Sequence, residues 1–408
     1  MARATNLEEA IRVLDPQKSL GGRELDEFYV SRDSRALKRI KTLLLQAAEV
    51  KVLFTGHRGA GKSTELAQLQ KDLDQFWTVS FSVFDKLDPN DLDYRDILFS
   101  IPLQILLKVE AGGQIRLKPR TIERIKEFQA DVEIEKTLQE KGSVEVTGGL
   151  KETFFSLFSF EAKLSKEAVT RKTLREKIAP HLSQLNILLN KLVRDIEAQL
   201  EGKKVLVLVE DIDKADPEVA TEIFFNRGVS MSQLPVAVIY AFPVALQASK
   251  HIKQINQYFG NCVALPSIKV REKDGSEAPI GIGKMTSMLN KRLESHLIEE
   301  SAKKKLAMAS GGIPRILIQL ARDACIEANI DEVMQVREED VDRAIANERA
   351  SFKRTLSHAQ LVLLRQVHNA KDMDVSEEYT DLIHNLSVLE YENGDPWYDV
   401  NPVAAALL

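Results

Sequence analysis

The run from Gly56 to Ser63 constrains the fold of this chain more than any other feature of its sequence. It has the pattern Gly-x-x-x-x-Gly-Lys-Ser, follows the short apolar run Lys51–Thr55, and precedes a helix-forming stretch from Lys62 to Leu73. A strand, a glycine-rich turn and the start of a helix, in this order, form a loop whose backbone N–H groups can surround a phosphate. The run therefore predicts an α/β core that binds nucleotide.

Each residue type in this loop has a mechanical reason to be there. Glycine lets the backbone wrap the phosphate, the Lys62 ammonium reaches the β- and γ-phosphate oxygens, and the Ser63 hydroxyl is a ligand for Mg²⁺. The sequence thus predicts ATP and Mg²⁺ as cofactors. We expect the nucleotide to be held by Gly56, Arg58, Gly59, Ala60, Gly61, Lys62, Ser63 and Thr64.

A second group of candidate residues follows the run Val205–Val209, which is apolar on both faces as a central parallel strand requires. An ATPase of this kind needs a carboxylate at the end of a neighbouring strand to hold Mg²⁺, and usually a second acid to polarise the attacking water. We assign Glu210 to the metal, directly or through water, and Asp211 to the catalytic base, beside the metal. Asp213 is an alternative for either role. The competing interpretation is that these acids, Asp213 above all, only cap a helix.

Further strands and helices alternate along the first part of the chain. Phe76–Phe84 and Val236–Phe242 are expected to be strands, and Asp91–Val109 a helix with an apolar face. Such alternation is typical of a parallel α/β sheet. We expect the strands that begin near Lys51, Val205 and Val236 to form its buried middle.

An insertion of about ninety residues, from about 110 to 200, separates the helix at Asp91 from the strand at Val205. We expect a charged helix over Arg120–Lys141, a hairpin over Ser143–Leu150, and one or two amphipathic helices over Arg171–Leu200 with a break at Pro180. A phenylalanine cluster lies between them and is expected to be core or a partner surface. Its members are Phe154, Phe155, Phe158 and Phe160.

The C-terminal third has a helical pattern. Helices are expected over Met285–Leu306, Pro314–Ala328 and Glu338–Lys353, the last with Asp340, Asp342 and Arg343 exposed. In the final segment, helices are followed by Leu386–Val400, where Asn393-Gly394-Asp395-Pro396 is a turn between two short strands. Helices followed by a hairpin indicate a winged helix.

Two motifs flank the core and carry a resemblance to a known family. Phe28-Tyr29-Val30-Ser31-Arg32 precedes the loop, and Ser310-Gly311-Gly312-Ile313-Pro314-Arg315 lies far downstream of it. Together with the loop and the winged helix, they resemble the adenine box and the lid of AAA+ and STAND ATPases, in an order similar to the origin-initiator branch of AAA+ proteins. The resemblance implies that Tyr29, Val30, Arg32 and Pro314 approach adenine, and that Arg315 approaches the γ-phosphate. A proline-led helix start explains the second motif without a ligand.

The resemblance implies three parts. These are a P-loop NTPase core with a parallel sheet over 1–265, an α-helical lid domain over 266–350 and a C-terminal winged-helix domain over 351–408. Two details depart from AAA+ proteins and are similar to STAND-like ATPases: the acids read Glu-Asp-Ile-Asp, and Ala241-Phe242-Pro243 stands where an asparagine is expected. Arg227 is a candidate arginine finger, with an ordinary surface arginine as the alternative.

Composition limits the partners. The net charge is -5, so no general positive field would hold the chain on nucleic acid or an anionic membrane. Cys262 and Cys325 lie far apart without metal-ligand spacing, and no apolar run approaches the ~20 residues that span a bilayer. We expect a cytoplasmic protein without membrane contact and without a disulfide framework.

Two functions remain open. One is a regulatory switch or assembly ATPase, homo-oligomeric and with a protein partner or effector, as in bacterial signalling or defence modules by analogy. The other is a DNA-associated AAA+ ATPase that loads or remodels a nucleoprotein complex. Residues 352–408 hold four basic and nine acidic side chains, which does not favour DNA. The best basic stretch, Lys166–Lys177, is explained as well by a solvated helix face.

Overall fold

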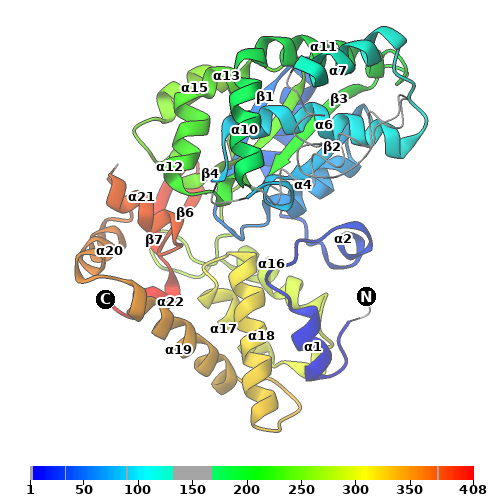
Figure 1. Cartoon of the computed structure of the whole chain (residues 1–408). Coiled ribbons are helices and arrows are strands. Elements are labelled where there is room, and N and C mark those ends of the chain that lie inside the picture. Colours follow the sequence, from blue (N-terminus) through cyan, green and yellow to red (C-terminus); the bar gives the residue numbers. More distant parts are fainter. Residues whose placement is uncertain (1–2, 33, 89–90, 132–167, 375) are drawn as a thin grey trace.

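The computed structural model describes residues 3–32, 34–88, 91–131, 168–374 and 376–408 (Figure 1). A parallel sheet covered by helices occupies one end of the molecule. A group of helices and a smaller unit of helices and a hairpin lie beneath it in the view of Figure 1. The expected hairpin at 143–150 and the phenylalanine cluster at 154–160 lie outside the described residues.

The sheet has five parallel strands in the order β2-β3-β4-β1-β5. They are β1 Lys51–Gly56, β2 Phe76–Ser82, β3 Lys204–Glu210, β4 Ala237–Pro243 and β5 Cys262–Ala264. The three strands expected in the middle, β1, β3 and β4, each have a neighbour on both sides. The strand expected to reach Phe84 ends at Ser82, because the Ser82 hydroxyl accepts the backbone N–H groups of Phe84 and Asp85 and starts the short helix α5 Val83–Lys86.

Successive strand residues bury opposite faces of the sheet, as the pleat requires. Val52 and Phe54 pack with residues of α3 Arg35–Gln46 and α4 Lys62–Lys71. Leu53 packs on the other face, with the apolar side of α6 Tyr94–Gly112. Because both faces are covered, the polar ends of the strands are left as the place for a site.

The described helices of the insertion belong to the core. Residues of α7 Pro119–Asp131, α10 Ala168–Ile178 and α11 Leu182–Glu197 bury apolar side chains in the same cluster as α6. The break expected at Pro180 is a 3₁₀ turn, η2 Ala179–His181. The remaining elements of the core are η3 Ile212–Lys214, α12 Pro217–Thr221, η4 Glu222–Asn226, α13 Gly228–Ser232, α14 Val244–Gln247 and α15 Ile252–Phe259.

The two arginines of the basic stretch in α10 do not lie on a solvated face, whereas Lys172 is exposed. Arg171 is 2% exposed and pairs with Asp88 and Asp91, while Arg175 pairs with Asp91 and Asp96. These arginines tie the insertion to the start of α6. They are therefore paired inside the fold. Neither interpretation of the stretch from the sequence, a basic surface for nucleic acid or a solvated helix face, applies to these two arginines.

The lid is a group of four helices joined by the first helix of the chain. The four are α16 Pro279–Asn290, α17 Glu300–Ala309, α18 Pro314–Ile330 and α19 Glu338–Thr355. Helix α1 Leu7–Val13 packs on α18 and shares its apolar cluster, whereas α2 Gly22–Phe28 lies nearer the sheet (Figure 1). Helix α1 therefore packs with the lid, although residues 1–265 were expected to form the core.

Two local predictions for the lid are wrong. The helix expected over Met285–Leu306 is split into α16 and α17, because the backbone between them bonds elsewhere: Glu294 N–H donates to the Ala4 carbonyl (3.0 Å), and Glu299 N–H to the Val336 carbonyl (3.1 Å). Asp340, expected to be exposed, is 0% exposed. Its carboxylate accepts the backbone N–H of Arg337 at 2.8 Å and caps α19.

The C-terminal unit has the helices and the hairpin that the sequence predicted for a winged helix. It contains α20 His358–Ala370, α21 Glu377–His384, the antiparallel pair β6 Val388–Asn393 and β7 Asp395–Val400, and α22 Pro402–Ala405. Its apolar cluster includes Val244 of α14, so the winged helix is packed against the core of its own chain. Across the described residues, no helix is both long enough and apolar enough to cross a membrane.

Candidate functional site

The loop between β1 and α4 has the backbone shape that a phosphate cradle needs. Gly59 has φ +79° and Gly61, which begins α4, has φ +94°; both values lie in the left-handed region. A Cβ atom at Gly59 would lie 2.5 Å from Cβ of Arg315, so a side chain there would push the lid away. Glycine therefore serves two purposes: it shapes the loop and lets the lid approach it.

Lys62 is buried behind this loop, with 7% of its side chain exposed. Its ammonium donates to the carbonyls of Gly56 (2.7 Å) and His57 (3.0 Å). It also forms an ion pair with Asp213 at 2.7 Å, and the Asp213 side chain is likewise 7% exposed. The acid that faces the loop lysine is thus Asp213.

Glu210, at the end of β3, lies where a metal ligand is expected. The Ser80 hydroxyl donates to its carboxylate at 2.7 Å, and the Ser63 hydroxyl bonds to the same carboxylate. Burial raises the pKa of Glu210, which the two hydroxyls partly oppose. Because Ser63 and Glu210 place two hard oxygens side by side, the pair fits Mg²⁺, which is held by few protein oxygens together with phosphate and water. Within the described residues there is no cluster of three or more His, Cys, Asp or Glu side chains that could hold a metal ion.

Asp211 is directed elsewhere. Its carboxylate accepts the Ser82 hydroxyl at 2.6 Å and pairs with Lys214 at 2.5 Å. Its backbone has φ +70°, which is uncommon for a residue with a side chain. The structure therefore brings Lys62, Ser63, Glu210 and Asp213 together, and Asp211 lines the same cavity with its carboxylate bonded to Ser82 and Lys214.

Residues of the expected adenine box, Phe28–Arg32, are bonded both to the loop side of the core and to the lid. The Arg32 guanidinium donates to the carbonyl of Ala60 (2.5 Å) and to that of Pro266, where the chain enters the lid. The Tyr29 hydroxyl donates to Glu65 of α4 at 3.1 Å, and the Lys291 ammonium of α16 donates to the Tyr29 carbonyl at 2.6 Å. The box thus joins the loop to the lid, mainly through side chains that donate hydrogen bonds to backbone carbonyls.

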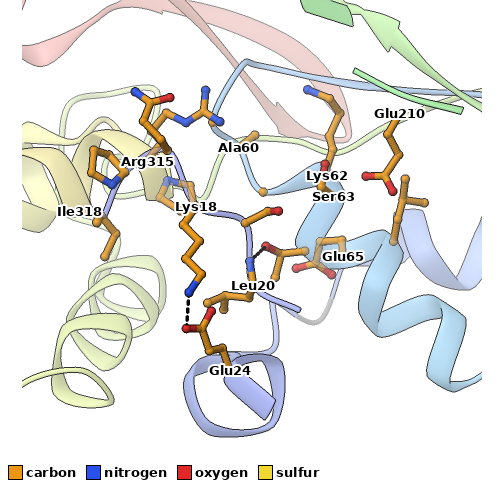
Figure 2. A pocket seen from close by; sticks show the side chains of 18 of the residues that line it. Lys18, Leu20, Glu24, Ala60, Lys62, Ser63, Glu65, Glu210, Arg315 and Ile318 are labelled. Atoms are coloured by element: carbon orange, nitrogen blue, oxygen red, sulfur yellow. Dashed lines mark hydrogen bonds and ion pairs between the residues drawn. The ribbon is translucent and has the colours of Figure 1, made fainter. Parts of the chain in front are cut away.

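A cavity of about 700 Å³ opens in front of the loop. Figure 2 shows Ser63 and Glu210 on one side of it, and Arg315 and Ile318 of α18 on the other. A third wall comes from residues 15–20, where Leu20 N–H reaches the Thr64 hydroxyl at 3.4 Å. No pattern in the sequence predicted that this segment lines the cavity, because it is mostly polar and has no periodicity.

Arg315 brings the lid to the loop. Pro314 occupies the first turn of α18, and the Arg315 N–H donates to the Gly59 carbonyl at 3.2 Å. Burial lowers the pKa of Arg315, and the nearby charge of Arg58 lowers it further. Val30 of the box packs against the apolar cluster of the lid. All the residues that the sequence predicted for the nucleotide except Gly56 therefore line one cavity, although they come from three parts of the chain.

The winged helix also reaches the loop, which the sequence did not predict. His57 is 2% exposed, and its Nε2 accepts the backbone N–H of Glu390 in β6 at 2.6 Å. Burial, with the charge of Lys62, lowers the pKa of His57 to about 3, so the imidazole is neutral. Tyr391 adds a bond from its hydroxyl to the Gly311 carbonyl at 2.8 Å. His57 occupies a variable position of the loop pattern, so the motif alone could not reveal this contact.

Arg227, the candidate arginine finger, has local partners. It pairs with Glu222 at 2.9 Å and lies 5.3 Å from the centre of the Tyr94 ring. Half of its side chain is exposed. These are the contacts of an ordinary surface arginine, and they do not support the assignment of Arg227 as an arginine finger.

Comparison with known proteins gives low similarity. No family model and no curated protein matches the sequence. Similar solved structures include the ORC2 protein of Aeropyrum pernix (14% identity, 97% of this chain and 95% of that chain, TM-score 0.43). Others are Drosophila ORC bound to DNA (13%, 100% and 95%, TM-score 0.40) and the Thermotoga maritima RuvB Holliday junction branch migration motor (12%, 97% and 98%, TM-score 0.39).

Because these TM-scores are low, the fold assignment rests on the chain itself. The phosphate-binding loop follows β1 in a parallel sheet, the acids follow β3, and one strand, β4, separates the two. A helical lid touches the loop through Arg315, and a winged helix follows the lid. These parts, in this order, form a parallel α/β core of the P-loop NTPase type, followed by a helical lid and a winged-helix unit, as the sequence predicted.

Proposed function

We propose that this chain is an ATP-hydrolysing regulatory switch, in which the nucleotide at the loop controls how the winged helix is held. The observation that carries the proposal is the hydrogen bond from Glu390 N–H to His57, a residue of the loop itself. Lys62 donates to the carbonyl of the same His57. A phosphate that binds the Lys62 ammonium would therefore act directly beside the residue that is bonded to the winged helix.

The loop and the lid would bind the phosphates. Residues Gly59 to Ser63 line the cavity, and Arg315 adds a positive charge from the lid. Ser63 and Glu210 would hold Mg²⁺, which would neutralise phosphate charge when bound. Adenine would lie between the box and α18, near Val30 and Pro314.

Hydrolysis would depend on Glu210 more than on Asp211. Glu210 is bonded to Ser63, where the two would hold Mg²⁺, whereas Asp211 is engaged by Ser82 and Lys214. Because Glu210 is the acid beside Ser63 and Asp211 is held by other groups, we expect ATP hydrolysis to be slow or to be stimulated by a partner.

Two observations weigh against a DNA-associated machine. The winged helix is acidic, and the arginines of the best basic stretch are paired inside the fold. DNA binding therefore becomes an outcome of the test below. A homo-oligomer, a protein effector, a cytoplasmic location and a role in a bacterial signalling or defence module stay predictions.

The test is to measure the size and shape of the full chain by light scattering and small-angle X-ray scattering, with ADP and with a slowly hydrolysed ATP analogue. We expect the two nucleotides to give different shapes. The matched control is the double variant Lys62→Met with Asp213→Asn, which removes a buried ion pair as a unit and should fold without holding phosphate. Identical shapes with both nucleotides, together with salt-sensitive duplex binding, would favour the DNA machine.

A further inference from the structure

We infer that Asp213 is a built-in counter-ion of the loop lysine, which competes with nucleotide phosphates and sets the affinity of the site. The inference rests on the proposed nucleotide binding and goes beyond it. It gives Asp213 a role that is neither metal ligand, nor catalytic base, nor helix cap.

The first observation is that Lys62 has no donor to spare. A lysine ammonium has three N–H donors, and Lys62 is in contact with three oxygens: the carbonyls of Gly56 and His57, and Oδ2 of Asp213. A phosphate oxygen must replace one of them. The two carbonyls belong to the loop backbone, so the anionic side chain of Asp213 is the partner that a phosphate can replace in kind.

The second observation is that the backbone is bent to place Asp213 there. Asp211 has φ +70°, and the next residues form the 3₁₀ turn η3, while Asp211 itself is held by Ser82 and Lys214. Unusual backbone of this kind persists where the surroundings enforce it. The bend turns Asp213 back toward the loop, although β4 separates β3 from β1.

The third observation is the charge around the pair. Arg315 lies close enough to Arg58, Asp211 and Asp213 for their charges to influence it: Arg58 lowers its pKa and the two acids raise it. Without the Asp213 carboxylate, the cations Lys62, Arg58 and Arg315 would share one partly desolvated region with less compensation. Asp213 therefore occupies the electrostatic position that a nucleotide phosphate would take.

The consequence is that nucleotide binding includes the separation of a buried ion pair. Both side chains of the pair are 7% exposed, so the pair is weakly screened by solvent. Asp213→Asn keeps the shape and removes the competing charge. It should therefore tighten the binding of ligands that carry a β-phosphate and leave AMP, which does not reach Lys62, unchanged.

The experiment is a calorimetric titration of the full chain with ADP and with AMP, in EDTA and in Mg²⁺. For Asp213→Asn we expect a dissociation constant for ADP about tenfold lower than in the unaltered protein, equivalent to about 1.4 kcal/mol. The matched control, Glu218→Gln, alters an exposed acid of α12 that does not line the cavity and should leave ADP affinity unchanged. An ADP affinity of Asp213→Asn equal to or weaker than that of the unaltered protein overturns the inference.

The outcome separates this inference from the proposed function. If neither the unaltered protein nor Asp213→Asn binds ADP, nucleotide binding itself is contradicted. If the unaltered protein binds ADP and only the gain is missing, the counter-ion role alone is wrong. Should Asp213→Asn not fold, Asp213→Ser, which is neutral and smaller, gives the same comparison. The melting temperature with increasing ADP provides a second readout, since tighter binding stabilises the folded state more at equal ligand concentration.

Discussion

Nε2 of His57, in the phosphate-binding loop, accepts the backbone N–H of Glu390 in the winged helix at 2.6 Å, across 333 positions of the chain. The bond is buried, since His57 is 2% exposed, and the backbone carbonyl of His57 is bonded to Lys62 on its other side. One residue thus contacts both the lysine that would hold phosphate and the wing. This relationship makes the coupling of ligand and wing testable at a single position.

Replacing His57 with alanine should loosen the winged helix. The change leaves the Glu390 N–H buried without a partner, which costs about 1–3 kcal/mol. Amide hydrogen exchange over β6 and β7, measured by mass spectrometry, should rise several-fold, with little change over β3 and β4. The control is His368→Ala, which removes a pair with Asp399 at 2.9 Å on the wing alone. Unchanged exchange in β6 would show that the bond does not hold the wing.

The stability of the molecule should also depend on the charge of Glu390. Burial raises the pKa of this carboxyl to about 7, from 4.5 for an exposed glutamate. Since the folded pKa is raised, its contribution to stability is fully present below about pH 4.5 and is lost as the pH rises through 7. From the size of the shift, the loss is at most about 3 kcal/mol.

Glu390→Gln should abolish this loss, because the amide stays neutral and can still accept a hydrogen bond from Tyr398. Urea unfolding between pH 5 and 8 should give a flatter pH profile than that of the unaltered protein. Asp395→Asn, at an exposed position of the same hairpin, is the control and should follow the unaltered protein. A Glu390→Gln profile as steep as the original would mean that another group carries the pH dependence.

Much of the core could be predicted from the sequence because its signals are local. The apolar run of β3, the glycines of the loop and the turn at Asn393–Pro396 each specify their own backbone. The lid was predicted less well. Its break between α16 and α17 depends on bonds to Ala4 and Val336, which lie far away in the sequence.

The site was predicted at the level of residue type and not of pairing. Lys62 and Ser63 lie where the loop pattern placed them, but a pattern cannot say which of three acids faces the lysine. That choice depends on the left-handed backbone of Asp211, which no composition or periodicity signals. The contact of His57 with Glu390 was missed for a similar reason, since it depends on how two distant units pack.

The two acids after β3 should differ in their effect on turnover. Glu210→Gln removes the carboxylate that lies beside Ser63 and would hold Mg²⁺, whose stabilisation of charge in the transition state is worth several kcal/mol. We expect the rate of phosphate release from ATP to fall by about 10²-fold or more while ADP still binds. Asp211→Asn should cost less, because Ser82 and Lys214 already engage this side chain. A larger loss in Asp211→Asn would restore Asp211 as the base.

Arg315 should discriminate between ATP and ADP. Its backbone N–H is bonded to Gly59, so the start of α18 stays at the loop when the side chain is removed. Arg315→Ala should therefore leave ADP affinity within about threefold and weaken ATP affinity about tenfold or more, as expected for the loss of one charge-assisted contact to the terminal phosphate, worth about 1.5–3 kcal/mol. Both affinities can be measured by titration with slowly hydrolysed ATP analogue and ADP. Arg354→Ala, at an exposed position of α19, is the control. Equal weakening of both ligands would place Arg315 at the part that they share, and the lid would then sense the presence of nucleotide and not its γ-phosphate.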